Sequence, residues 1–155
     1  MKLVPFHATV PPIVTVWLAP KVGTAITPVE PGCALASTVI VNALQRHATL
    51  VVQKSLAEGF GLTVSEAMYK RRPVVGSAVG GIADQIVDGD TGVLLPDPTD
   101  LGAFADSLAQ LLGASERLVT MGNRAHERVV DQFLPDSQLT RWRRLVSALL
   151  DQTDG

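Results

Sequence analysis

Residues 50–67 read LVVQKSLAEGFGLTVSEA, and this stretch decides the fold class. Its first three residues form a short, continuously apolar run, which is typical of a strand buried on both faces. Two glycines, Gly59 and Gly61, then interrupt the pattern, and Leu62–Lys70 has the apolar spacing of a helix. The stretch therefore predicts a buried strand, a glycine-rich loop and a helix in succession, which is the repeating unit of an α/β fold.

The same alternation extends in both directions from this stretch. Pro73–Gly76 and Val93–Leu95 are further apolar runs, Ile82–Val87 between them is expected to be a short helix, and Val39–His47 has a helical stripe. Longer helices are expected over residues 100–112, 115–133 and 136–150, with Asp100 and Ser115 as N-caps. Strands separated by helices predict a parallel, Rossmann-like sheet with flanking helices. Three strands are fewer than the roughly five or six of a complete doubly wound domain.

Residues 1–38 differ in composition from the rest of the chain. They contain six of the ten prolines and only three charged side chains. Proline lacks the amide donor and restricts φ, so it disfavours helices and central strands. We interpret residues 1–38 as a proline-rich leader with no recognised fold, residues 39–150 as the folded domain and residues 151–155 as a tail. Residues 13–18 are a candidate edge strand, and a secretory signal ending near residues 34–36 is the alternative for this region.

The composition excludes several classes of protein. The chain has 155 residues, 46% of them hydrophobic and 18% charged, which suits one globular domain or part of one and not a disordered chain. A net charge of −2 lacks the basic footprint of a nucleic-acid-binding protein. No apolar run is long enough for a membrane span, and the single cysteine argues against a disulfide framework. We expect a cytoplasmic protein with no metal site, because its three histidines lack ligand spacing.

Two carboxylates flank the glycine-rich loop, Glu58 before the glycines and Glu66 inside the following helix. The first amides of that helix, with the helix dipole, form a site suited to phosphate. Carboxylates accept hydrogen bonds from sugar hydroxyls. Together these groups indicate a nucleotide-sugar as ligand. Two alternatives remain open: Thr63 and Glu66 also match a capping box, and Glu58 could be an ordinary solvated carboxylate.

These residues also carry a resemblance to a known family. Glu58 and Glu66 match the E-x7-E signature of retaining GT-B glycosyltransferases of glycosyltransferase family four. The match continues through residues 72–76 (RPVVG), 79–82 (VGGI) and 88–92 (DGDTG). Residues 42–46 (NALQR) and 51–66 are similar to the trehalose synthase branch of that family. The resemblance covers residues 39–150 and implies an incomplete carboxyl-terminal half of a GT-B fold.

The resemblance implies an activity and a set of site residues. The activity is retaining transfer of glucose from a nucleoside-diphosphate-glucose to a sugar acceptor, with trehalose as product of the complete enzyme. Glu58 would hold hydroxyls of the reacting sugar, and Glu66 would hold the ribose. The backbone contacts to the donor would come from Phe60, Gly61, Leu62 and Thr63. Further contacts to donor or acceptor would come from Gln53, Lys54, Gly80 and Gly81. Neither a cofactor nor a metal is implied beyond the nucleotide-sugar substrate.

Two departures from the family pattern leave other functions open. The family's arginine–lysine pair, which neutralises the leaving diphosphate, has no match in residues 1–38, and an amino-terminal acceptor domain is missing. We therefore expect a fragment that requires such a domain or self-associates as a homo-oligomer. A nucleotide-sugar-binding remnant without turnover and a nucleotide-sugar epimerase are the alternatives. A dinucleotide-dependent oxidoreductase is disfavoured, because Gly59 and Gly61 lack the third glycine of its fingerprint.

Overall fold

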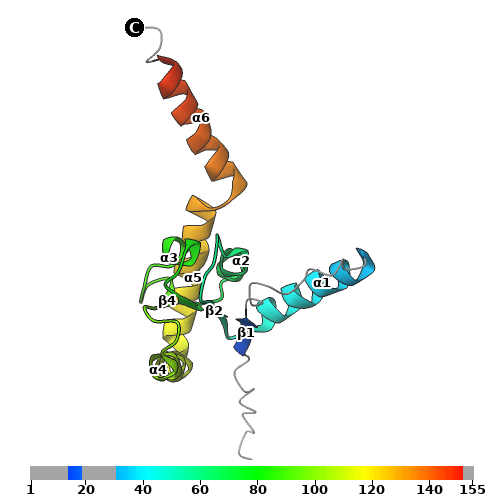
Figure 1. Ribbon diagram of the computed structural model, residues 1–155, viewed down its shortest axis with the longest axis vertical. Helices are drawn as coiled ribbons and strands as arrows, with labels where there is room; N and C mark the ends of the chain where they lie inside the picture. Colours follow the sequence, from blue (N-terminus) through cyan, green and yellow to red (C-terminus); the bar gives the residue numbers. More distant parts are fainter. Residues whose placement is uncertain (1–13, 19–30, 152–155) are drawn as a thin grey trace, which may run out of the picture.

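A computed structural model describes residues 14–18 and 31–151 of the chain (Figure 1). Strands and helices alternate from the beginning of the described part, and three helices end it. The elements are β1 (Val14–Leu18), α1 (Pro31–His47), β2 (Leu50–Lys54), α2 (Leu62–Tyr69), β3 (Val74–Ser77), α3 (Gly81–Gln85), β4 (Gly92–Leu95), α4 (Leu101–Leu112), α5 (Ser115–Gln132) and α6 (Pro135–Asp151).

The described strands form one four-stranded parallel sheet in the order β1-β2-β3-β4. Val51 pairs with Val74 and Val52 with Val75, so the apolar runs of β2 and β3 lie side by side. Each strand is joined to the next through a helix, as parallel pairing requires. The carboxyl ends of β2, β3 and β4 therefore meet at one edge of the sheet, where ligands bind in open α/β folds.

Helices cover both faces of this sheet. Alternate residues of β2 and β3 point to opposite sides, so each strand contributes to the core on both faces. On one face, Val51 and Val74 pack with buried residues of α2, α3 and α5. On the other, Leu50, Val52 and Val75 pack with Leu111 of α4 and Leu118 and Met121 of α5. Burial on both faces explains why the strands are continuously apolar in the sequence.

The predicted parallel α/β class is confirmed, with one more strand than the three expected. The extra strand is β1, which lies at the edge of the sheet and pairs with β2, as proposed for residues 13–18. Helix α1 begins at Pro31, so the boundary expected at residue 38 falls inside this helix. The remainder of the expected leader, residues 1–13 and 19–30, lies outside the described residues, as do residues 152–155 of the expected tail.

One of the two expected N-caps is confirmed. The Asp100 carboxylate accepts a 2.9 Å hydrogen bond from the Ala103 amide at the beginning of α4. The Ser115 cap is wrong, since Ser115 is the first residue of α5 and Ala114 occupies the cap position without a side-chain hydrogen bond.

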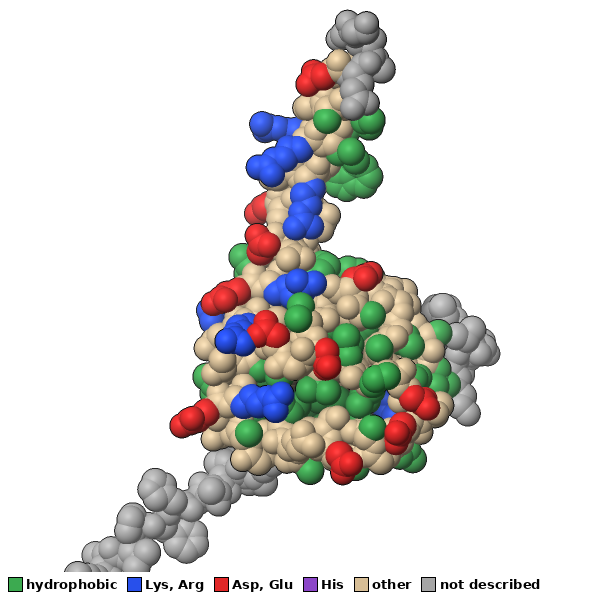
Figure 2. Space-filling model, turned by 90° about the vertical axis from the view of Figure 1, so that its left-hand side faces the viewer, with side chains coloured by type: hydrophobic (Ala, Val, Ile, Leu, Met, Phe, Trp, Pro, Cys, Tyr) green, Lys and Arg blue, Asp and Glu red, His purple; other side chains and the backbone are tan. Residues whose placement is uncertain are grey.

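Helix α6 projects away from the part of the molecule that contains the sheet (Figures 1 and 2). None of its residues is buried. Its exposed apolar side chains lie along one side and its arginines along another (Figure 2). The apolar ones are Leu139, Trp142, Leu145, Val146, Leu149 and Leu150. The apolar face of this helix is therefore not covered by any of the described residues. Within the described ranges, no helix has the length and apolarity needed to cross a bilayer.

Candidate functional site

The loop between β2 and α2, residues 55–61, lies at the carboxyl edge of the sheet. Its first residue is tied to the neighbouring strand, because the Ser55 amide donates to Ser77 Oγ at 3.1 Å. Gln53, near the end of β2, is 1% exposed. Its Nε2 donates to Ser55 Oγ at 3.0 Å and to Glu58 Oε2 at 3.4 Å. The end of β2 thus supports the loop through hydrogen bonds from the Gln53 side chain.

Glu58 is half-buried and held in place from two sides. Besides the bond from Gln53 to Oε2, its Oε1 accepts a 3.1 Å hydrogen bond from the Gly59 amide. An ordinary solvated carboxylate would lack such support, so the structure favours an oriented Glu58 at the mouth of the loop. Gln53, expected to contact substrate directly, is buried and reaches the site through Glu58.

Gly61 forms the N-cap of α2 in a left-handed conformation, with φ of 81°. A residue with a Cβ would be strained there, so the glycine is needed for the sharp entry into the helix. No side chain of the described residues caps α2, and the first helical bond is from the Val64 amide to the Gly61 carbonyl. The first amides of α2 therefore remain available to an anionic ligand.

The capping-box interpretation of Glu66 is wrong. A capping box needs Thr63 at the N-cap, but α2 begins at Leu62 after Gly61. The Glu66 side chain is exposed, and its Oε2 accepts a 3.3 Å hydrogen bond from Gln45 Nε2 of α1. Glu58 thus precedes the uncapped end of α2 and Glu66 lies about one turn inside this helix, and each is hydrogen-bonded to a buried glutamine from another element.

The second glycine turn, Gly80 and Gly81, packs directly against the first. The Gly81 amide donates to the Gly59 carbonyl at 2.7 Å. A Cβ on Gly80, where φ is 50°, would lie 1.9 Å from the Glu58 carbonyl oxygen. These glycines therefore let two backbones meet, and direct contact of Gly80 and Gly81 with a ligand stays a prediction.

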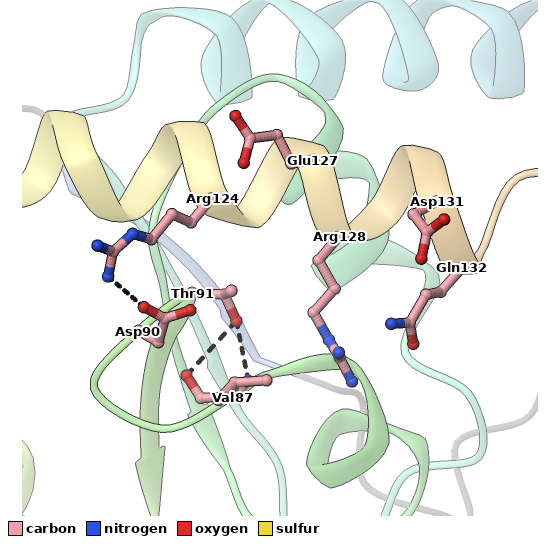
Figure 3. A pocket seen from close by; sticks show the side chains of 8 residues that line it. All are labelled: Val87, Asp90, Thr91, Arg124, Glu127, Arg128, Asp131 and Gln132. Carbon is pink, nitrogen blue, oxygen red and sulfur yellow. Dashed lines mark hydrogen bonds and ion pairs between the residues drawn. The ribbon is translucent and has the colours of Figure 1, made fainter.

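Residues that the sequence did not single out hold the loop from the other side. Gln85 is fully buried at the end of α3, and its Nε2 donates to the carbonyls of Phe60 and Gly61. Arg128 of α5 points toward α3 (Figure 3), where it donates to the carbonyls of Gln85 (2.7 Å) and Asp84 (2.8 Å). In the sequence, Gln85 could have been found as a polar residue in a short helix directly after a glycine turn. No sequence feature pointed to Arg128.

Aromatic contacts connect the same residues. The rings of Phe60 and Phe133 lie 6.1 Å apart between centroids, and the Arg128 guanidinium lies 5.7 Å from the Phe133 centroid. The hollow beside Arg128, about 560 Å³, contains the Arg124–Asp90 ion pair and none of the predicted site residues (Figure 3). We infer that this face of α5 supports the loop.

Replacing Gln85 with leucine should loosen the glycine-rich loop. The change leaves the carbonyls of Phe60 and Gly61 without their side-chain donor, which is expected to cost about 1–3 kcal/mol of the free energy of unfolding. Urea denaturation measures this cost. Gln110→Leu, on the exposed surface of α4, is the matched control and should stay within about 0.5 kcal/mol of the parent chain. Equal stabilities of the two variants would show that Gln85 does not hold the loop.

Lys54 and Asp97 add charge at the same edge, at the ends of β2 and β4. Hydrogen bonds from the side chain and backbone of Thr99 lower the pKa of Asp97, with smaller contributions from the Asp100 amide and the Lys54 charge. The Thr99 bonds to Asp97 Oδ1 measure 2.6 Å and 2.7 Å. Asp97 therefore stays ionised near Lys54 at neutral pH, and a role of Lys54 toward substrate stays a prediction.

Comparison with known proteins identifies the family. Residues 37–128 match the model of the family described as glycosyl transferases group 1. The chain belongs to this family. Trehalose synthase from Thermococcus litoralis is 44% identical over 108 residues, which are 70% of this chain and 26% of that protein. The chain thus spans about a quarter of the length of the curated relatives it matches.

Solved glycosyltransferases have a similar fold. Sucrose-phosphate synthase from Thermosynechococcus elongatus superimposes with a TM-score of 0.62 at 32% identity, covering 71% of this chain and 28% of that one. A TarM variant from S. aureus, solved in complex with fondaparinux, alpha-GlcNAc-glycerol and UDP, gives a TM-score of 0.61 at 30% identity and covers 68% and 21%. The predicted relation to GT-B glycosyltransferases is confirmed. This chain, a member of the group 1 family, corresponds to part of the GT-B fold.

Proposed function

We propose that this chain is the donor-binding part of a retaining glycosyltransferase that uses a nucleoside-diphosphate-glucose. The observation that carries the proposal is the pair of supported carboxylates, one before the uncapped end of α2 and one in its second turn. Gln53 holds Glu58 and Gln45 holds Glu66, and both glutamines are 1% exposed. Such support orients a carboxylate toward a ligand, where a free surface carboxylate would rotate.

In this proposal, each part of the donor binds to a different group of the chain. The diphosphate would lie at the first amides of α2, residues 61–63, where the helix dipole favours negative charge. Glu58 would accept hydrogen bonds from hydroxyls of the glucose, and Glu66 from those of the ribose. The family relation and the UDP in the TarM structure support a nucleotide in this position.

In the reaction, the bond between glucose C1 and the diphosphate oxygen breaks, and an acceptor hydroxyl forms its bond to C1 from the same face. The proton of the acceptor hydroxyl is transferred to the departing diphosphate oxygen on that face, so that the nucleoside diphosphate leaves with it. Glu58 would position the sugar and stabilise positive charge developing at the ring. Similarity to trehalose synthases supports glucose as acceptor and trehalose as product, and the acceptor would contact parts of the protein beyond this chain.

Titration calorimetry with UDP, ADP, GDP and their glucose derivatives tests the proposal. We expect one nucleotide-glucose to bind, with affinity above that of the nucleoside diphosphate alone. Incubation with nucleotide-glucose and glucose then separates the reactions, since transfer yields a disaccharide and epimerisation yields a different nucleotide-hexose. If none of the six ligands gives binding heat, the proposed donor site is overturned. An epimerised product would overturn the proposed reaction.

A further inference from the structure

Gln45 of α1 connects the candidate ribose-binding residue to a lysine. Its side chain is 1% exposed, and both of its polar atoms are hydrogen-bonded. Lys70 Nζ, just beyond α2, donates to Gln45 Oε1, and Gln45 Nε2 donates to Glu66 Oε2 at 3.3 Å. A buried amide thus lies between an ammonium group and a carboxylate that are four residues apart in the sequence.

The chemistry of the three groups fixes the orientation of the amide. An ammonium group only donates hydrogen bonds and an ionised carboxylate only accepts them. The Gln45 oxygen must therefore face Lys70, and its NH2 group must face Glu66. Rotating the amide by half a turn would bring oxygen against oxygen and donor against donor. Lys70 consequently determines which end of Gln45 meets Glu66.

The electrostatics agree with this arrangement. Burial lowers the pKa of Lys70, while the nearby Glu66 charge raises it and Arg46 lowers it. Glu66 and Lys70 form no direct ion pair, the only one among the described residues being Arg124–Asp90. Gln45 holds one carboxylate oxygen of Glu66 from the side of α1, and the Glu66 side chain is otherwise exposed.

We propose that Lys70 and Gln45 are positioning residues that set the Glu66 carboxylate for two adjacent ribose hydroxyls. The proposal rests on the proposed function, since it assigns Glu66 to the ribose of the donor. A held carboxylate accepts a hydrogen bond from each hydroxyl, whereas a rotating one meets them in many orientations. Lys70 and Gln45 therefore give the site its preference for ribonucleotides over 2′-deoxyribonucleotides. Because Gln45 lies in α1, this helix becomes part of the donor site.

The test compares the affinities of UDP and 2′-deoxy-UDP by calorimetry. The parent chain should bind UDP about tenfold more tightly, because 2′-deoxy-UDP lacks one hydrogen bond to a charged acceptor. Gln45→Met preserves side-chain volume and removes both polar atoms. It should weaken UDP binding by about fivefold to tenfold, leave 2′-deoxy-UDP nearly unchanged and so abolish the preference. Gln110→Met, on the exposed side of α4, is the matched control and should keep the preference.

The outcomes separate this proposal from the proposed function. A folded Gln45→Met variant that keeps the tenfold preference would overturn the positioning role, while the donor site would stand. If neither Gln45→Met nor Glu66→Gln alters a preference that the parent chain shows, the ribose assignment itself is wrong. Should Gln45→Met fail to fold, Lys70→Met tests the same contact from its other end. Retention of the parent's preference in Lys70→Met would then overturn the proposal.

Discussion

Gly80→Ala is expected to destabilise the protein more than any other single methyl addition in the two glycine turns. The new Cβ would lie 1.9 Å from the Glu58 carbonyl oxygen and 2.9 Å from its carbonyl carbon, both of which are backbone atoms. Gly80 also has φ of 50° and ψ of −143°, a conformation that favours glycine. Clash and strain together should remove about 2–6 kcal/mol from the free energy of unfolding.

Thermal unfolding measures this loss as a decrease of roughly 5–20 °C in Tm. Gly59→Ala is the matched control, because it adds the same methyl group to the adjoining loop with no atom within 4 Å and no positive φ. It should stay within about 1 kcal/mol of the parent chain. A Gly80→Ala variant as stable as Gly59→Ala would show that the two glycine turns do not meet as described.

Glu58→Gln is expected to remove the contribution of the sugar to donor binding. The substitution keeps the size of the side chain and loses the negative charge that strengthens hydrogen bonds from sugar hydroxyls. Affinity for UDP-glucose should fall by about tenfold to a hundredfold, whereas affinity for UDP should change by less than about twofold. The ratio of the two affinities, measured by calorimetry, reports the sugar contact alone.

Glu127→Gln supplies the matched control for this experiment. Glu127 is an exposed glutamate of α5, outside the glycine-rich loop, and its replacement changes the net charge equally. Its affinity ratio should equal that of the parent chain. If Glu58→Gln also leaves the ratio unchanged, or weakens UDP and UDP-glucose to the same extent, Glu58 does not bind the glucose.

Much of the fold could be predicted because its signals are local. Leu62–Lys70 was expected to be a helix, and α2 spans Leu62–Tyr69. The glycine-rich loop was expected between this helix and a buried strand, and it lies there at the carboxyl edge. A run of apolar residues, a glycine that permits positive φ and a helix stripe are each encoded within a few residues.

The beginning of the fold was predicted less well. Proline density suggested a leader, yet α1 begins at Pro31, where the first turn of a helix tolerates proline because its amide has no partner. Strand β1 pairs with β2 across more than thirty intervening residues, and no local pattern encodes such pairing. β1 lies at the edge of the sheet, which is where a strand in a proline-rich segment is tolerated.

The sequence by itself determined the strand–loop–helix order and the two carboxylates beside the glycines, because those features depend on neighbours along the chain. Only the tertiary structure decided what holds them. Gln45 meets Glu66 across 21 residues and Arg128 meets Gln85 across 43. A buried amide or guanidinium has several potential partners in any sequence, and the packing of distant helices selects among them. That selection distinguishes an oriented carboxylate from a solvated one.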